Sequence, residues 1–304
     1  MPLETNRYPG RTDLQPGQVA RLVTVDRDGQ NRREVLTTKR LIEAPNWTPD
    51  GKWLIVNCGG LLYRVSPEGG ELEHIPTGEV STCNNDHIIS PDGRTIYVSA
   101  TGHLYAIPAE GGAATRVSNV HPETPDYYFW YYLHGVSPDG KMLAYVSVEP
   151  FNGERRGHRK IRLIPSAGGA DICLTDFDEP ADGPEYTPDG EWIWFNWEMN
   201  GHRKGHAQLF RMRPDGSDKQ QMTFDEEVNW FPHFSPDGKD IVFLTYAQGT
   251  ISHPADVELA IRRMPAEGGE PVEIVRFFGG QGSLNVNSWS PDSTRFAYVE
   301  YPEG

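Results

Sequence analysis

The sequence lacks the features of a membrane-inserted or secreted chain. No apolar run approaches the roughly 18 residues that a membrane-spanning helix needs. Residues 1–7 have no basic start, no apolar stretch and no small-residue cleavage site, so no secretory signal is visible. These absences predict a cytoplasmic protein.

Basic residues and cysteines are also scarce. Lys and Arg number 28 against 43 Asp and Glu, which gives a net charge of −15. This charge argues against nucleic acid and anionic membrane surfaces as partners. The three cysteines, Cys58, Cys83 and Cys173, are odd in number and lack metal-type spacing. Cys58 and Cys173 fall in expected strands, where a small buried thiol is the ordinary interpretation.

Helical periodicity and several common catalytic motifs are missing. The chain has no Gly-x-Ser-x-Gly elbow, no glycine-rich phosphate loop opening a helix and no His-Glu-x-x-His helix. It has instead one turn written six times, Ser/Thr-Pro-Asp-Gly/Ser, at residues 48–51, 90–93, 137–140, 187–190, 235–238 and 290–293. Pro fixes φ at the first corner, Asp bonds to its own backbone and Gly takes the strained last position. The turn aspartates are therefore structural.

The spacing of the turns predicts the fold. Successive turns begin 42, 47, 50, 48 and 55 residues apart. A typical unit continues with an alternating strand (95–99), a second strand (104–107), a Gly-Gly hairpin and a third strand (115–117). The residues before each turn make the fourth strand. Four short strands per 40–50 residues predict an all-β, six-bladed β-propeller of four-stranded blades.

The two chain ends complete the ring. The last turn is followed by only one strand, 295–299, whereas the chain begins with strands 19–25 and 33–37. The N-terminal strands should therefore close the last blade and pair its open edges. We expect a single domain over residues 1–304.

The repeat consensus is Ser-Pro-Asp-Gly, strand, Ile/Leu-Tyr/Phe-x-Ile/Met-Pro-x-x-Gly-Gly, strand. It resembles the β-propeller repeats of the TolB family from about residue 19 to 301. TolB itself is a periplasmic binding platform, so the resemblance implies a propeller that binds a partner. Oligogalacturonate lyase has similar blades and is a metal-dependent enzyme that holds its ion with channel histidines. That second resemblance implies a lyase.

A site is expected where the inner strands begin, at the channel mouth opposite the repeated turns. His87, His134 and Asn287 stand three residues before their turns, where the other blades have proline, and Glu185 and His233 stand two residues before theirs. Further polar or aromatic candidates for ligand binding lie close by: Asp86, Asp182, Asn229, Trp230 and Asn285.

The three histidines His87, His134 and His233 are a candidate set of ligands for one divalent metal ion. Whether that ion would be Mn, Ca or Zn stays open. The alternative is that each imidazole bonds to backbone or water, as is common in polar propeller channels.

Two basic segments, 154–160 and 200–206, are expected as loops on the same face, and they carry six of the 28 basic residues. Arg155, Arg159 and Arg203 are candidates for gripping a carboxylate. They predict a small anionic ligand or saccharide, unless these tips are simply solvated.

The longest insertion, 246–258, brings His253 towards the mouth. His253 and His134 are the candidate catalytic residues. The aromatic run 127–132 could stack on sugar rings or pack between blades. Two functions follow: a propeller that binds, and in its lyase form cleaves, an anionic carbohydrate, or a non-catalytic platform for a protein or peptide.

Overall fold

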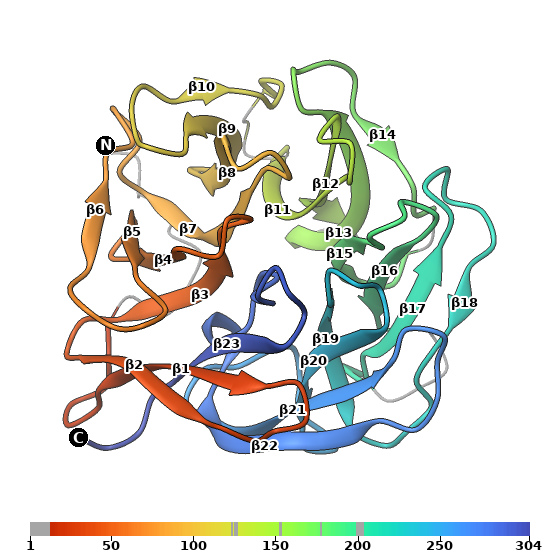
Figure 1. Ribbon diagram of the computed structural model, residues 1–304. Coiled ribbons are helices and arrows are strands. Elements are labelled where there is room, and N and C mark those ends of the chain that lie inside the picture. Colours follow the sequence, from red (N-terminus) through yellow and green to blue (C-terminus); the bar gives the residue numbers. More distant parts are fainter. Residues whose placement is uncertain (1–12, 123, 125–126, 152–153, 177, 199–203) are drawn as a thin grey trace.

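The computed structural model describes residues 13–122, 124, 127–151, 154–176, 178–198 and 204–304, with the backbone alone for residues 151 and 154–157. Six antiparallel sheets are arranged as a ring around a central axis (Figure 1). The only helix among the described residues is the short 3-10 turn η1 (Gln281–Ser283). The predicted all-β, six-bladed propeller is confirmed.

Blades 1 to 5 have four strands each, ordered from the channel outwards. Their bounds are β3 (Ile42–Trp47), β4 (Leu54–Cys58), β5 (Leu61–Val65) and β6 (Glu73–Ile75) in blade 1; β7 (Cys83–Ile89), β8 (Thr95–Ala100), β9 (His103–Pro108) and β10 (Thr115–Arg116) in blade 2; β11 (Trp130–Val136), β12 (Met142–Phe151), β13 (Glu154–Pro165) and β14 (Ile172–Cys173) in blade 3; β15 (Ala181–Tyr186), β16 (Ile193–Trp197), β17 (Gln208–Met212) and β18 (Gln220–Gln221) in blade 4; β19 (Val228–Phe234), β20 (Asp240–Tyr246), β21 (Val257–Pro265) and β22 (Val272–Gly279) in blade 5.

The sixth blade is built from both ends of the chain, as predicted. Strand β23 (Arg295–Glu300) pairs with β1 (Ala20–Asp26), and β1 pairs with β2 (Arg33–Thr38). Its innermost position is taken by residues 287–289, which join β23 through one bridge between Trp289 and Phe296. The pairing leaves β23 without an open edge.

The repeated turns form a ring of their own on one face. In all six, the Ser or Thr hydroxyl donates to the Asp carboxylate at 2.6–2.7 Å. The glycine of a turn packs against the proline of the preceding blade, as Gly93 does on Pro49 and Gly140 on Pro91. In the sixth turn Ser293 replaces glycine, and its hydroxyl accepts from the Asp237 amide at 2.9 Å. The turns therefore hold neighbouring blades together.

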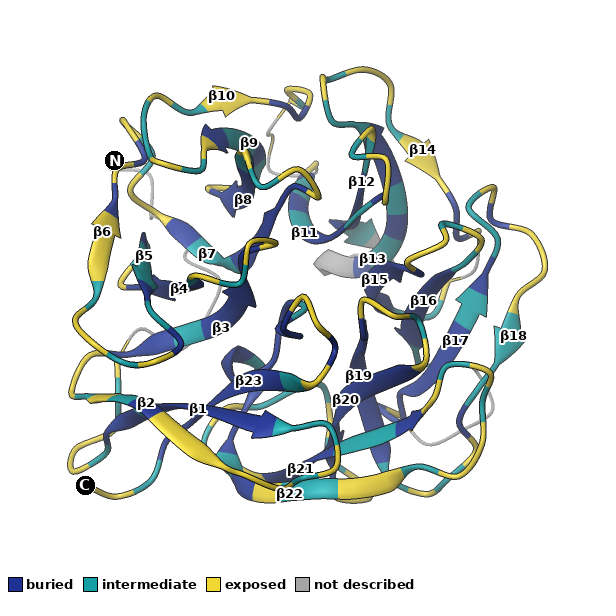
Figure 2. Ribbon diagram, viewed as in Figure 1, coloured by how far each residue is buried: buried dark blue, intermediate teal, exposed yellow. Residues whose placement is uncertain are grey.

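Buried apolar residues fill the interfaces between blades, whereas the outer strands are largely exposed (Figure 2). One buried cluster lies at each of the six interfaces. In the run 127–132, Tyr128, Phe129 and Tyr131 are buried, and the last two belong to the interface of blades 2 and 3. Trp130 stays half-buried. Phe129 and Tyr131 therefore pack between blades, as one of the two interpretations of this run expects.

One predicted loop is wrong. Residues 154–160 belong to strand β13, which pairs with β12 from Met142 to Phe151. The hydrogen-bonded ladder continues beyond the length of a usual blade strand, so the basic residues lie on a two-stranded ribbon. The second and third strands of blades 1 and 2 are joined by two residues each, whereas blade 5 has the expected long connection, 247–256.

No helix of the described residues is long and apolar enough to cross a membrane. The cytoplasmic location and the absence of nucleic-acid and membrane partners stay predictions.

Candidate functional site

A backbone irregularity near the end of each inner strand decides where the predicted site residues lie. The register shifts before the turn in all five inner strands β3, β7, β11, β15 and β19. At this point Ala44, Gly183 and Phe231 have positive φ values of 56°, 62° and 55°. Such a bulge re-aims the neighbouring side chains. Residues at equivalent sequence positions consequently face different surroundings.

Four of the predicted residues form a buried floor across the channel: Asp86, His134, Asp182 and Asn285. His134 Nε2 lies 3.2 Å from Asp182 Oδ1, and its ring stacks on Phe231 with centroids 5.5 Å apart. Asn285 Nδ2 donates to Asp86 Oδ1 at 2.6 Å. Blade 3 thus contacts blade 5, and blade 6 contacts blade 2. Since neither pair of blades is adjacent, these contacts cross the centre of the ring.

The floor contains three ionisable groups: the imidazole of His134 and the carboxyl groups of Asp86 and Asp182. Burial disfavours the charged form of His134, but its hydrogen bond to Asp182 and the charge of Asp86 outweigh this and raise its pKa. Burial likewise acts against ionised Asp182, yet His134, Arg159 and His253 hold its pKa at about 2. Burial raises the pKa of Asp86, and the charge of Asp182 adds to the rise. The raised pKa of His134 and the lowered pKa of Asp182 both favour the ionic form of this pair.

Three other predicted residues form a belt between blades 4, 5 and 6: Glu185, His233 and Asn287. Glu185 Oε2 lies 2.6 Å from His233 Nδ1, while its Oε1 accepts from Asn287 Nδ2 at 2.7 Å and from the Phe234 amide at 2.8 Å. His233 Nε2 lies 3.2 Å from the carbonyl oxygen of Leu284. Both ring nitrogens and the carboxylate thus bond within the protein, so these residues join blades.

The predicted metal ligands do not come together. His87 Nε2 lies 3.4 Å from the carbonyl oxygen of Ile55 in blade 1, and burial lowers the pKa of His87 to about 4. His134 and His233 each face a separate carboxylate. Within the described ranges, no group of three or more His, Cys, Asp or Glu residues could hold a metal ion. The donor set therefore does not fit the expected site.

The accessible part of the site is a rim above the floor, formed by Arg159, Glu198 and His253, all of them half-buried. His253 packs edge-on against Trp230, with centroids 4.6 Å apart, and burial lowers its pKa to about 4. Burial raises the pKa of Glu198, while the charge of Arg159 opposes the rise. Arg159 and His253 both act on the charge of Asp182. These interactions place the rim beside the floor.

Sequence reasoning missed Glu198. Its amide donates to the Pro180 carbonyl at 3.0 Å, which places it at the mouth end of blade 4. In the sequence, Glu198 follows directly after the second strand of its blade, β16. Aligning the residues that follow each second strand, and not only those before each turn, would have selected it.

The remaining candidates lie outside the floor and the belt. Asn229 is buried and bonds to Asp225 and Thr245, and Trp230 lies beneath His253 with 1% of its surface exposed. The side chain of Arg155 and all of Arg203 lie outside the described residues.

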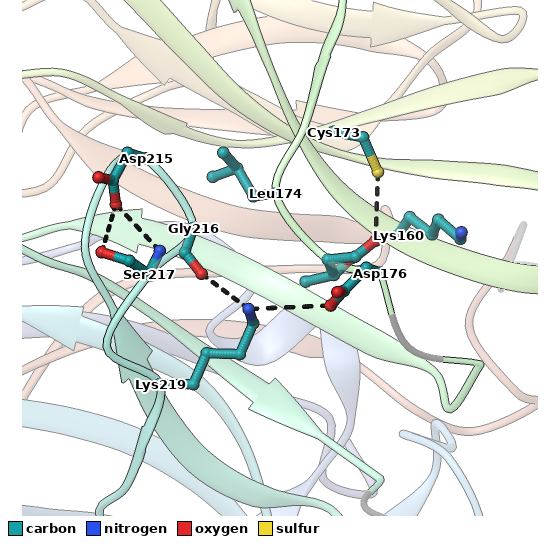
Figure 3. Close-up of a pocket in the computed structure, with 9 residues that line it drawn as sticks. Lys160, Cys173, Leu174, Asp176, Asp215, Gly216, Ser217 and Lys219 are labelled. Atoms are coloured by element: carbon teal, nitrogen blue, oxygen red, sulfur yellow. Dashed lines mark hydrogen bonds and ion pairs between the residues drawn. The ribbon is translucent and has the colours of Figure 1, made fainter.

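A shallow groove of about 560 Å³ lies away from the channel, between the outer edge of blade 3 and the β17–β18 turn of blade 4 (Figure 3). Lys160 and Lys219 line it together with Asp176. Cys173 lies in this groove and is exposed, with its thiol donating to the Thr175 carbonyl at 3.2 Å. The predicted burial of Cys173 is wrong because β14 is the outermost strand of its blade.

Comparison with known proteins identifies the family. The chain is 38% identical over 270 residues to an uncharacterized protein of Agrobacterium fabrum, covering 88% of each. It also matches a solved TolB-like structure from Agrobacterium tumefaciens at 36% identity and a TM-score of 0.84, over 94% of this chain and 99% of the other. The chain belongs to the TolB-like β-propeller family. No family model matches it.

More distant structures share the propeller fold. TolB from Acinetobacter baumannii is 19% identical with a TM-score of 0.60, over 84% of this chain and 65% of that one. An oligogalacturonate lyase in complex with manganese is 14% identical with a TM-score of 0.55, over 88% and 75% of the two chains. Both resemblances of the repeat are therefore confirmed at the level of fold.

Proposed function

We propose that this TolB-like propeller binds a carboxylate-bearing saccharide at the mouth beside blades 3, 4 and 5. The observation that carries the proposal is the half-buried rim of Arg159, Glu198 and His253 above the ionic floor. A guanidinium can bind a carboxylate through two parallel hydrogen bonds. Carboxylates can accept hydrogen bonds from sugar hydroxyls. The rim thus offers complementary groups to both parts of an acidic sugar.

Cleavage of such a ligand by β-elimination would need a base near the carbon next to its carboxylate. The lowered pKa of His253 leaves its imidazole neutral near pH 7 and able to accept that proton. The electron pair of the broken C–H bond would form the carbon–carbon double bond as the glycosidic C–O bond breaks, and the leaving oxygen would take a proton from water. Appearance of ultraviolet absorbance from an unsaturated uronate would support this step, and a His253→Ala variant should abolish it.

Binding is tested by calorimetric titration with galacturonate and with neutral galactose. Arg159→Gln should weaken galacturonate binding at least tenfold and leave the weaker galactose binding unchanged, because the lost contact is to the carboxylate. Arg116→Gln, an exposed arginine on the outer strand of blade 2, is the matched control. Equal galacturonate affinity in wild type and Arg159→Gln would contradict the proposal.

A protein or peptide platform is the second candidate function. Phe224 and Ile251 are 77% and 60% exposed, and both lie in mouth-face connections of blades 4 and 5. A hydrogen bond of 3.0 Å between Gln248 and Glu226 joins those two connections. Exposed apolar side chains on two connections that are bonded to each other favour protein contact. Under this function, a Phe224→Ser, Ile251→Ser double variant would lose a partner that wild type retains, while its affinity for galacturonate stays unchanged.

A further inference from the structure

The mouth has a second side, formed where blades 6, 1 and 2 meet. Glu43 lies near the start of β3, Asn84 and Asn85 near the start of β7, and Gln281 in η1 just before blade 6. All four are half-buried. We call these residues the amide side, because three of them carry a side-chain amide. Inner strands begin at the mouth, so the amide side shares that face with the rim.

Hydrogen bonds connect the amide side to the floor. Gln281 Nε2 donates to Asn285 Oδ1 at 3.2 Å, and Asn84 Nδ2 donates to Asp86 Oδ2 at 2.6 Å. Glu43 packs closely on η1, because a Cβ on Gly282 would clash with its Oε1. The amide side thus contacts the floor through Asp86 and Asn285, and the rim acts on the same floor through Asp182.

Asn85 has the weakest contacts of the group. Its Nδ2 lies 3.5 Å from Glu43 Oε1, and its Oδ1 lies 3.5 Å from Asn285 Nδ2. Both distances are at the limit for a hydrogen bond. The amide can exchange them for shorter bonds to a ligand hydroxyl without leaving a strong internal bond unmade.

We propose that the amide side is a second sugar subsite that takes a neutral residue of an oligosaccharide whose acidic residue lies on the rim. The inference rests on the proposed function and names its ligand class more narrowly. An amide both donates and accepts, as a sugar hydroxyl does, so Asn85 and Gln281 match a neutral sugar ring.

The charges of the amide side argue against a second acidic residue there. Its members are three amides and the carboxylate of Glu43, which lies 3.5 Å from the Asn85 amide, and Asn84 donates to the carboxyl of Asp86 in the floor. A uronate at this place would meet like charge, which is unfavourable where water is partly excluded. The ligand is therefore a mixed saccharide, one uronate linked to a neutral sugar, and not a homopolymer of uronates.

The experiment compares three probes by calorimetric titration: free galacturonate, digalacturonate and an aldobiouronic acid, which links one uronate to one neutral sugar. We expect the aldobiouronic acid to bind about tenfold more tightly than galacturonate, and digalacturonate to bind no more tightly than galacturonate. Asn85→Ala and, independently, Gln281→Ala should remove most of that tenfold gain and leave galacturonate affinity unchanged. Gln30→Ala, an exposed amide on the β1–β2 hairpin, is the control.

Two results would contradict the proposal of a second subsite and leave the proposed function intact. One is an equal gain for digalacturonate; the other is an aldobiouronic acid affinity that survives both Asn85→Ala and Gln281→Ala. Failure of the proposed function looks different, because then no acidic probe binds or Arg159→Gln changes none of the affinities. That outcome would overturn both proposals.

Discussion

The two ends of the inner strands differ in how strictly they repeat. At the turn end, six copies of one turn make the same hydroxyl–carboxylate bond and interlock into a ring. At the mouth end, the blades carry side chains of different chemistry, and the connection between the second and third strands ranges from two residues in blades 1 and 2 to ten in blades 4 and 5. The turn end is therefore a structural frame, and chemical variety is concentrated at the opposite end.

The belt lies between these two ends. It shows that a difference in residue type between equivalent positions of the blades does not by itself indicate a ligand site. Glu185 and His233 differ from the residues at the equivalent positions of the other blades, yet they bond to each other and to neighbouring backbone. In blade 1 Asn46 takes a similar part, since its Oδ1 accepts from the Ile89 amide and its Nδ2 donates to the Asn287 carbonyl. The belt thus continues the frame towards the mouth with different residues.

The largest expected effect concerns the belt. Glu185→Ala should lower the free energy of unfolding by about 3–5 kcal/mol, because it leaves His233, Asn287 and the Phe234 amide without their buried acceptor. Urea unfolding followed by tryptophan fluorescence measures it. A decrease in the free energy of unfolding of less than about 1 kcal/mol would mean that Glu185 does not join the blades. The belt would then belong with the ligand-binding residues and not with the structural frame.

The next prediction concerns the floor and its pH dependence. The pKa of Asp182 falls from 3.8 to about 2 on folding, so its contribution is present above pH 3.8 and is lost as the pH falls towards 2. His134 has a raised pKa, so its contribution is present below the unfolded value of about 6.5 and is lost as the pH rises through the folded value.

Asp182→Asn should therefore be less stable than wild type by on the order of 2 kcal/mol near pH 5. The difference should shrink towards pH 2 and again above neutrality. Denaturant unfolding of both proteins across this range measures it, with Asp182→Asn, His134→Gln as the matched double variant. A difference that does not vary with pH would show that the floor pair is not ionic.

The fold was predictable because its signal is local and repeated. Pro, Asp and Gly specify each turn within four residues, and the six turns with their spacing specify the ring. The site was less predictable because the direction of an inner-strand side chain depends on the bulge. Ala44 and Phe231 take positive φ there without any glycine to signal it. His87 consequently faces Ile55, whereas its counterpart His134 reaches the floor.

A smaller effect tests the ring of turns. Gly190 has φ 74° and packs on Pro138, so Gly190→Ala should lower the unfolding free energy by about 1–2 kcal/mol. Ser293 occupies the same place in the sixth turn with φ 61°. Ser293→Gly should change stability little, since the gain in backbone freedom offsets the lost bond to the Asp237 amide. Thermal unfolding measures the stability of the Gly190→Ala and Ser293→Gly variants. Equal losses of stability would show that the backbone of the sixth turn does not gain from glycine as the other turns do.

The smallest effect is expected at the mouth face. Phe224→Ser with Ile251→Ser should change the free energy of unfolding by less than about 0.5 kcal/mol, because both side chains are mostly exposed and removing them opens no cavity. The same denaturant titration used for Glu185→Ala measures it. A loss of more than about 1 kcal/mol would mean that these side chains hold the connections of blades 4 and 5 together. The frame would then extend to the mouth face, and the platform function would lose the exposed surface that favours it.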